Sequence, residues 1–289
     1  MVVKKAFKNI GIYSSKKNKR IKLISEQVLE ILNNLGKKAY ISDSTNFLSS
    51  AHEVCTDKKL ISKVDLIIAI GGDGTLLSSA RKFGIEGIPI LGINLGNLGF
   101  LTDIPPEDLT GLLRKVFEGK FEADERVFLK SAINNKHFHI ALNEAVIHAG
   151  QIAQLIEYEL YINEKFVYRQ KADGIIISTS TGSTAYSMSG NGPILHPDVK
   201  AFCLLPMFPL SLNTRPLLVD DNSTIKIRML SKKSKLSLDS HTHKNINFKD
   251  EIEVKKADEC FTLIHPEDHD FFNACRTKLG WSLGLELEE

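Results

Sequence analysis

Along residues 1–122, short apolar runs alternate with segments in which apolar residues recur at helical spacing. Apolar residues recur at helical spacing from Ile21 to Leu35, and Gly36 follows as a stop signal. A second helix is predicted over Glu107–Phe117, between a Pro-Pro pair and a glycine. The runs that predict strands are Asn9–Tyr13, Lys38–Ile41, Val64–Ile70 and Ile88–Ile93. Strands that alternate with helices predict a parallel sheet covered on both faces.

The pattern becomes strand-like after residue 122. Residues 156–162 alternate between apolar and polar positions, and Asn163-Glu164 predicts a hairpin turn after them. Further strands are predicted at Phe138–His148, Phe166–Arg169, Gly174–Ser178, Thr224–Met229 and Glu251–Lys255. We therefore expect an α/β domain at 1–122, an all-β or β-rich domain at 123–265, and a helical tail over 266–289 that returns to the first domain.

Length and composition narrow the class of protein. At 289 residues the chain is long enough for two domains, and a net charge of +2 gives no electrostatic reason to bind nucleic acid or an anionic membrane. The four cysteines lack metal-ligand spacing, which is typical of reduced thiols in a cytoplasmic protein. No signal peptide is expected, and the apolar run Ala201–Thr214 is too short and too broken by proline to span a membrane.

The strand predicted at 64–70 ends in a glycine-rich turn that leads into a helix. Glycines there would allow positive φ angles and close approach of a ligand, while the helix N-terminus points N–H groups at an anion such as phosphate. A carboxylate beside such a cradle repels the ligand. Asp73 therefore either caps the helix, or accepts a proton from a hydroxyl that attacks a phosphoryl group, or helps to hold a metal ion. The candidate phosphate-binding residues of this turn are Gly71, Gly72, Gly74 and Thr75.

Three further segments carry polar or glycine-rich patterns. Residues 92–102 place three glycines after a strand, as a ligand-binding loop or an ordinary connection would. Asn143-Glu144 interrupts an apolar run, and the pair either faces solvent or offers acceptors to ribose hydroxyls or a base edge. Residues 178–189 hold eight Ser or Thr hydroxyls, which suit an oxygen-rich ligand better than a linker.

Several well-known site patterns are missing from the sequence. Two His-x-His pairs lack a third ligand of matching type, so we expect exposed strand histidines and no metal site built from side chains. Neither a Walker A motif nor the G-x-G-x-x-G dehydrogenase fingerprint occurs, which argues against a simple nicotinamide oxidoreductase.

Taken in order along the chain, these motifs resemble those of NAD kinases. The turn at 71–75 alone is also shared with phosphofructokinases and with diacylglycerol and sphingosine kinases. Asn143-Glu144 together with Gly182-Ser183-Thr184-Ala185-Tyr186 makes the resemblance specific, and it covers nearly the whole chain, including Lys278-Leu279-Gly280-Trp281. The resemblance implies an α/β domain followed by a β-sandwich-like domain. It also implies transfer of the terminal phosphoryl group of ATP to the 2′-hydroxyl of the adenosine ribose of NAD, with a divalent metal, Mg²⁺.

The resemblance also implies roles for individual residues. Asp73 would accept the proton, Gly74 would lie against the ribose and phosphates, and Asn143 with Glu144 would hold the adenosine. The remaining NAD-binding residues would be Lys171, Asp173, Thr184, Ala185, Tyr186, Ser187, Met188 and Ser189. His241 stands where relatives often have an amide. NAD kinases are homo-oligomers whose NAD site borrows from a neighbouring subunit, so a homodimer or homotetramer is expected, with ATP or polyphosphate as donor. The alternatives are a lipid or sugar kinase that shares the turn, or a non-catalytic dinucleotide sensor.

Overall fold

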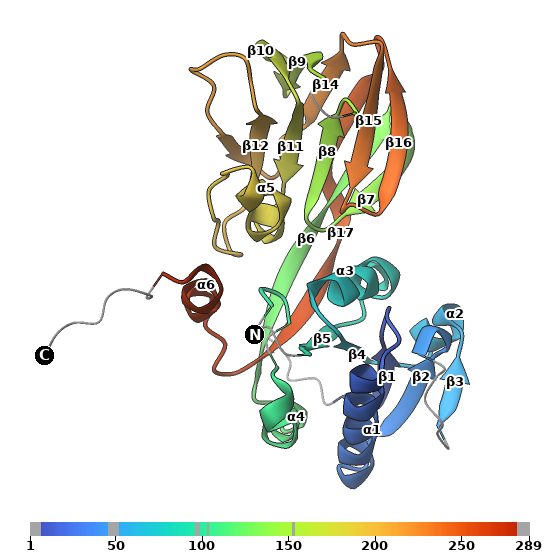
Figure 1. Cartoon of the computed structure of the whole chain (residues 1–289). Helices are drawn as coiled ribbons and strands as arrows, with labels where there is room; N and C mark the ends of the chain where they lie inside the picture. Colours follow the sequence, from blue (N-terminus) through green and yellow to red (C-terminus); the bar gives the residue numbers. More distant parts are fainter. Residues whose placement is uncertain (1–6, 46–51, 96–98, 103, 152–153, 282–289) are drawn as a thin grey trace, which may run out of the picture. The chain divides into compact units, whose positions relative to one another are not determined.

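A computed structural model of the chain describes residues 7–45, 52–95, 99–102, 104–151 and 154–281. The chain divides into two compact units, residues 1–125 with 260–289 and residues 126–259. The strands β6 (Phe121–Ile133) and β17 (Glu251–Pro266) pass from one unit into the other, as the ribbon in Figure 1 shows.

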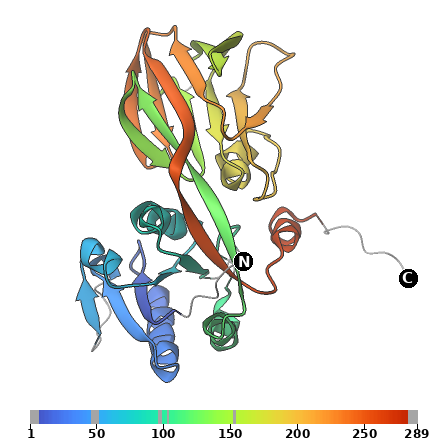
Figure 2. The same ribbon diagram turned by 180° about the vertical axis from the view of Figure 1, so that it is seen from behind.

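The first unit is built on a parallel sheet in the order β3-β2-β1-β4-β5, to which the end of β17 adds at β5. Its strands are β1 (Asn9–Tyr13), β2 (Lys38–Ser42), β3 (Glu53–Cys55), β4 (Leu66–Ile70) and β5 (Ile90–Ile93). Its α-helices are α1 (Lys19–Asn34), α2 (Asp57–Ile61), α3 (Asp73–Lys82), α4 (Leu109–Phe117) and α6 (Phe271–Leu279), and Figure 2 shows them from behind.

Helices cover both faces of this sheet, as the alternation of elements predicts. Apolar residues of α1 and α4 share one core with Ile10, Ile12 and Ile68 of the strands. On the other face, α2 packs on Gly11 through Leu60, and α3 packs on Gly92 through Leu76. The parallel neighbours β1 and β4 lie where the strand order reverses, and open α/β sheets bind ligands outside the carboxyl ends of such strands.

The second unit is a two-layered antiparallel β-sandwich, in agreement with the alternating pattern. One layer has the order β13-β12-β11-β8-β15-β16 and the other includes β10-β9-β14-β17. Side chains of β9, β14, β11 and β15 from the two layers meet in one core. The strands are β7 (Lys136–Ala141), β8 (Glu144–His148), β9 (Ile156–Ile162), β10 (Lys165–Ala172), β11 (Gly174–Ser178), β12 (Ala201–Met207), β13 (Leu217–Asp220), β14 (Ile225–Met229), β15 (Lys233–Leu238) and β16 (Thr242–Asn247).

Several local predictions are confirmed and two are wrong. The turn between β9 and β10 has positive φ at Asn163 and Glu164, as a tight hairpin requires. The strand predicted at 138–148 is instead two strands, β7 and β8, because the chain turns at residues 142–143. The strand predicted at 251–255 continues to Pro266. No described helix has the length and apolar character needed to cross a bilayer.

Candidate functional site

The glycine-rich turn joins β4 to α3, but none of Gly71, Gly72 and Gly74 has a positive φ. Positive φ among the described glycines occurs elsewhere, for example at Gly36 and Gly119, so that prediction is wrong. Gly71 is required by close packing, since a Cβ there would lie 2.2 Å from Thr75 Oγ1. A Cβ at Gly72 or Gly74 would meet nothing within 4 Å. These two positions therefore leave space beside the first turn of α3 for a ligand.

Asp73 does not cap α3, because the N-cap residue is Gly72 and it makes no side-chain cap bond. The capping alternative is therefore wrong. The Asp73 carboxylate instead accepts hydrogen bonds from residues 100–102. The donors are Phe100 N at 3.1 Å, Leu101 N at 3.2 Å, Thr102 N at 3.3 Å and Thr102 Oγ1 at 3.2 Å. Several N–H groups that converge on one carboxylate fix its position and orientation.

The loop that donates these bonds is itself held in place. Asn94 Nδ2 donates to Thr102 O and Oγ1, each at 3.1 Å. A Cβ at Gly99 would lie 2.1 Å from Asp73 Oδ1, so only glycine allows this approach. Asn94 and residues 99–102 therefore support Asp73 and do more than connect two elements. Gly96 lies outside the described residues.

The first turn of α3 offers backbone N–H groups to a ligand, whereas the hydroxyl of Thr75 is not available to one. Thr75 is buried, and its Oγ1 lies 2.9 Å from Ser15 Oγ of the loop after β1. Its N–H donates to Gly72 O at 2.8 Å. The N–H groups of Asp73 and Gly74 belong to the first turn, where a helix has no intrahelical acceptors, so they can receive an anion.

The carboxylate of Asp239 organises the turn that carries Asn143 and Glu144. Asp239 accepts hydrogen bonds from the N–H groups of Leu142 at 2.9 Å, Asn143 at 2.8 Å and Glu144 at 3.3 Å. Asp239 has a positive φ of 46° in the β15–β16 connection. Sequence reasoning missed this clamp; the signal available was an Asp at a hairpin tip, which says nothing about a partner almost a hundred residues away.

Glu144 is buried beside this clamp. Burial, and then the charge of Asp239, raise the pKa of Glu144 to about 8, and a hydrogen bond from the Tyr186 backbone only partly offsets them. Within the described residues its Oε2 has no hydrogen-bond partner. Asn143 is buried as well. The pair therefore does not face solvent, and Glu144 keeps an unsatisfied acceptor.

The hydroxyl-rich segment forms two short helices, residues 181–184 and α5 (Tyr186–Ser189). Most of its hydroxyls face inward, so the expectation that they line a ligand surface is wrong for them. Thr179 Oγ1 donates to Leu142 O at 2.6 Å, and Ser183 Oγ donates to Ser180 O at 2.7 Å. A Cβ at Gly182 would lie 2.1 Å from Asn143 O. The segment is therefore packed directly on the turn that carries Asn143.

The positions after Gly182 differ in exposure. Ser187 is fully buried, whereas Tyr186 is 44% exposed. Thr184, Ala185 and Met188 are half-buried and Ser189 is exposed. His241 is exposed, so its imidazole is open to solvent two residues after Asp239. Its backbone N–H donates to Leu238 O at 2.9 Å.

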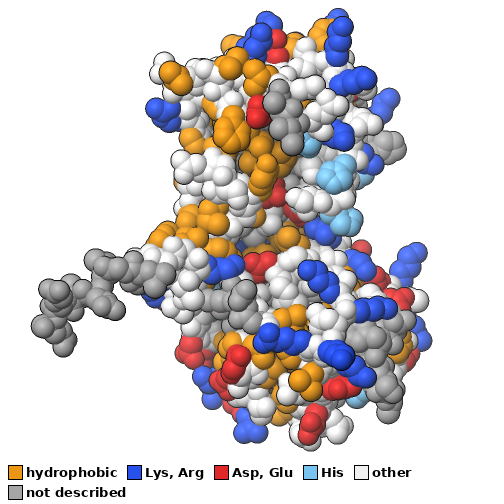
Figure 3. Space-filling view, viewed as in Figure 1, with side chains coloured by type: hydrophobic (Ala, Val, Ile, Leu, Met, Phe, Trp, Pro, Cys, Tyr) orange, Lys and Arg blue, Asp and Glu red, His pale blue; other side chains and the backbone are white. Residues whose placement is uncertain are grey.

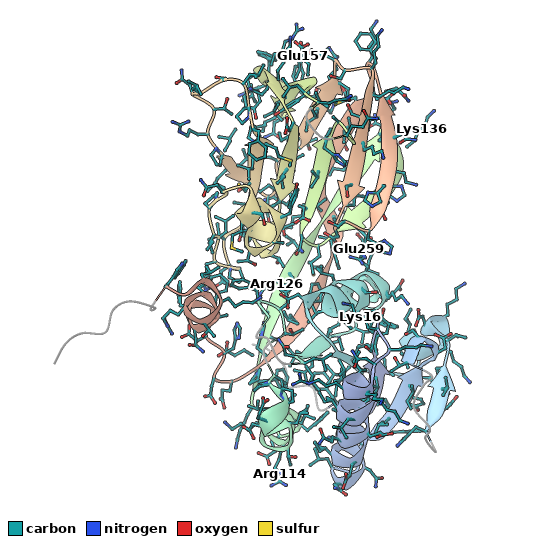
Figure 4. All side chains as sticks on the ribbon, viewed as in Figure 1. Lys16, Arg114, Arg126, Lys136, Glu157 and Glu259 are labelled. Carbon is teal, nitrogen blue, oxygen red and sulfur yellow. The ribbon has the colours of Figure 1, made fainter. Side chains whose placement is uncertain are left out.

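The structure does not bring Lys171 and Asp173 close to Glu144 within one chain. β11 pairs Ser178 with Glu144 at one end and Gly174 with His148 at the other. Asp173 is five residues before Ser178 and therefore lies about 17 Å along the strand direction from the Glu144 end. Lys171 Nζ lies 3.7 Å from Glu157 Oε2, and Figure 4 labels Glu157 at the end of the unit away from α5.

Charges of both signs are interspersed on the face of the molecule that Figure 3 draws. This face therefore shows no broad field of one sign.

Comparison with known proteins agrees with this arrangement. The sequence profile of the ATP-NAD kinase N-terminal domain matches residues 2–121, and that of the C-terminal domain matches residues 142–266. The NAD kinase of Pseudomonas putida is 40% identical over 295 residues, covering 96% of this chain and 97% of the relative. That of Shewanella halifaxensis is 46% identical over 228 residues, covering 76% and 74%.

Two solved structures share the fold. Yeast NADH kinase complexed with NADH superposes with a TM-score of 0.87 at 24% identity, covering 98% of this chain and 90% of that one. An NAD kinase from Archaeoglobus fulgidus in complex with ATP has a TM-score of 0.73 at 24% identity, covering 93% and 99%. On the family profiles and the sequence identity to curated relatives, the chain belongs to the NAD kinase family.

Proposed function

We propose that the chain transfers the terminal phosphoryl group of ATP to the 2′-hydroxyl of the adenosine ribose of NAD, giving NADP and ADP. The observation that carries this proposal is the Asp73 carboxylate, which residues 100–102 hold at the N-terminus of α3. In the reaction the ribose 2′-oxygen forms a bond to the γ-phosphorus while the bond to the β,γ-bridging oxygen breaks. The hydroxyl proton passes to Asp73.

A carboxylate is a weak base for a ribose hydroxyl, yet it suffices here. Phosphoryl transfer passes through a loose transition state, so the proton can leave late and the main contribution of the protein is positioning. The N–H donors from residues 100–102 supply that positioning for Asp73. The first-turn N–H groups of α3, beside the open space at Gly72 and Gly74, would receive phosphate oxygens, with Gly74 against the ribose as well.

Asn143 and Glu144 would hold the adenosine side of NAD. Glu144 Oε2 is buried and, among the described residues, accepts no hydrogen bond, which is costly unless a ligand hydroxyl fills the role. The exposed and half-buried positions among Thr184, Ala185, Tyr186, Met188 and Ser189 would line the pocket, while the buried Ser187 would support it from behind. His241, near the Asp239 clamp, can donate one hydrogen bond where relatives have an amide.

Lys171 and Asp173 would reach a dinucleotide bound to another subunit. They lie at the far end of β11 from Glu144, which supports a homodimer or homotetramer in which one chain completes the site of the next. In this division of labour, residues 1–122 form the catalytic domain, 123–265 the NAD-binding domain and 266–289 a tail on the first. The four free cysteines suit a reducing cytoplasm.

A divalent metal fits this site as part of the nucleotide. No group of three His, Cys, Asp or Glu side chains in the described part of the chain could cage an ion, and Mg²⁺ commonly binds through phosphate oxygens and few protein ligands. When bound, Mg²⁺ would neutralise charge on the β- and γ-phosphates.

The test is direct. Purified protein is incubated with Mg²⁺, NAD and either ATP or polyphosphate, and NADP is measured with an NADP-specific dehydrogenase. We expect NADP to form with ATP, and the polyphosphate arm decides the donor range. NAD binding without NADP formation would favour the dinucleotide sensor, and absence of NAD binding would favour another kinase.

A further inference from the structure

The C-terminal helix α6 brings a lysine to the carboxylate at the start of α3. Lys278 Nζ lies 3.7 Å from Asp73 Oδ2 and 4.3 Å from the centre of the Phe100 ring. The lysine side chain is 28% exposed and that of Asp73 is 32% exposed. The ammonium therefore lies against the aromatic face and close to Asp73, and solvent can still reach the pair.

Several contacts besides this lysine hold α6 on the first unit. Phe271 lies with its ring 6.4 Å from that of Phe100, and Cys275 is fully buried. Lys115 Nζ of α4 lies 3.1 Å from Asp268 Oδ2, just before the helix. Because α6 has these other anchors, Lys278 is not needed merely to attach it.

The two oxygens of Asp73 have different environments. Oδ1 accepts hydrogen bonds from Leu101 N, Thr102 N and Thr102 Oγ1. Among the described residues Oδ2 accepts only from Phe100 N and faces Lys278. A carboxylate oxygen has two lone-pair sites, so Oδ2 is the one with room for a substrate hydroxyl. The lysine thus stands at the oxygen that would take the proton.

The ammonium beside Oδ2 is placed to act on negative charge that develops next to this oxygen in the transition state. In phosphoryl transfer this charge is spread over the three equatorial oxygens of the transferred group, which lies in line with the attacking hydroxyl oxygen that Oδ2 would contact.

Resting on the proposed function, we propose that Lys278 is a catalytic residue that moves from Asp73 Oδ2 to an equatorial oxygen of the phosphoryl group during transfer. A hydroxyl bound to Oδ2 at about 2.7 Å places the phosphoryl oxygens within reach of a flexible lysine stem. Lys278 keeps its proton throughout. Asp73 takes the proton of the 2′-hydroxyl, and ADP leaves with the electron pair of the broken bond.

The test compares Lys278→Ala, Lys278→Arg and a matched control, Lys115→Ala, in the full-length protein. Lys115 also pairs with the C-terminal segment but does not approach Asp73 in the described contacts. Loss of one preorganised charge donor lowers kcat by about 10²–10³-fold in other enzymes, and we expect a fall of that order for Lys278→Ala with KM for NAD nearly unchanged. Lys278→Arg should keep most of kcat, and Lys115→Ala should keep all of it.

Chemical rescue separates catalysis from support of the fold. Methylammonium added to Lys278→Ala should restore part of kcat with a saturating concentration dependence and should not affect Lys115→Ala. The proposal is overturned by wild-type kcat in Lys278→Ala, by an equal loss in Lys115→Ala, or by a loss without rescue that follows a lowered Tm. Wild-type protein that makes no NADP would instead overturn the proposed function.

Discussion

Asp73 and Glu144 are two carboxyl groups with opposite surroundings. Asp73 accepts three backbone N–H bonds and one hydroxyl bond and is one-third exposed. Glu144 is buried next to another carboxylate, and its pKa rises to about 8. The comparison teaches that the fold holds the same functional group in two ways: Asp73 is fixed in orientation but open to solvent, whereas Glu144 is buried beside a like charge. In the proposed function the first would receive a proton and the second would accept a ligand hydroxyl.

Removing the charge of Asp73 should have the largest effect on activity. Asp73→Asn keeps the size of the side chain but cannot take the ribose proton, so we expect kcat to fall by a factor on the order of 10² or more, with little change in NAD affinity. Steady-state NADP formation and calorimetric NAD binding measure the two quantities. Asp239→Asn is the matched control, because that carboxylate also accepts backbone N–H bonds but supports the Glu144 turn. If it lowers kcat as strongly as Asp73→Asn, the division of roles is wrong.

Glu144 should make the fold less stable as the pH rises. A carboxyl whose pKa is raised from 4.5 to about 8 contributes its full stability below pH 4.5 and loses it as the pH rises through 8. The loss is at most about 1.4 kcal/mol per pH unit. Glu144→Gln removes this titration, so its Tm should exceed that of the wild type above pH 8 and match it near pH 4.5. Equal pH profiles in thermal melts would show that Glu144 ionises normally.

Gly182 and Gly74 differ in surroundings: Gly182 is closely packed, whereas Gly74 borders open space where a ligand could bind. Gly182→Ala places a methyl group against Asn143 O, and we expect a loss of about 1–3 kcal/mol in the free energy of unfolding. Gly74→Ala adds a methyl group in open space within α3, where alanine favours the helix, so stability should hold or rise. Its use of ATP should fall, because the methyl occupies the proposed phosphate space. Urea melts and the KM for ATP test both; full activity in Gly74→Ala would place the phosphates elsewhere.

His241 should matter least. Its imidazole is exposed and can supply one hydrogen bond, so His241→Gln should change the KM for NAD by no more than about fivefold, equivalent to about 1 kcal/mol. A change of more than tenfold, in either direction, would show that the imidazole makes a buried contact with the ligand.

The elements that position the turn at 71–75 follow from local pattern. Buried parallel strands are continuous apolar runs, and helices of the first unit end at glycines such as Gly36 and Gly119, both with positive φ. The sequence pattern did not predict the polar strands β15 and β16. They carry lysines that face solvent and so lack a clear apolar run. β12 contains Pro206 and resembles a broken apolar run.

The contacts of the site could not be predicted in the same way. Hydrogen bonds from residues 100–102 to Asp73 and from residues 142–144 to Asp239, and the ion pair of Lys278 with Asp73, join parts of the chain that local propensity cannot connect. The motif marked the candidate residues, whereas the inward direction of most hydroxyls in 178–189 depends on the tertiary packing of Gly182 against Asn143.

The discontinuity of the first unit has a consequence for synthesis on the ribosome. Residues 126–259 are contiguous, so they can complete their sandwich while the earlier α/β unit still waits for residues 260–289. Until Leu263 and Ile264 emerge and pair with Ile90 and Leu91, β5 has an open edge of unpaired N–H and C=O groups. The nascent chain therefore stays exposed to aggregation until residues 263–264 have left the ribosome, and stalling before that point should recruit chaperones to the first unit.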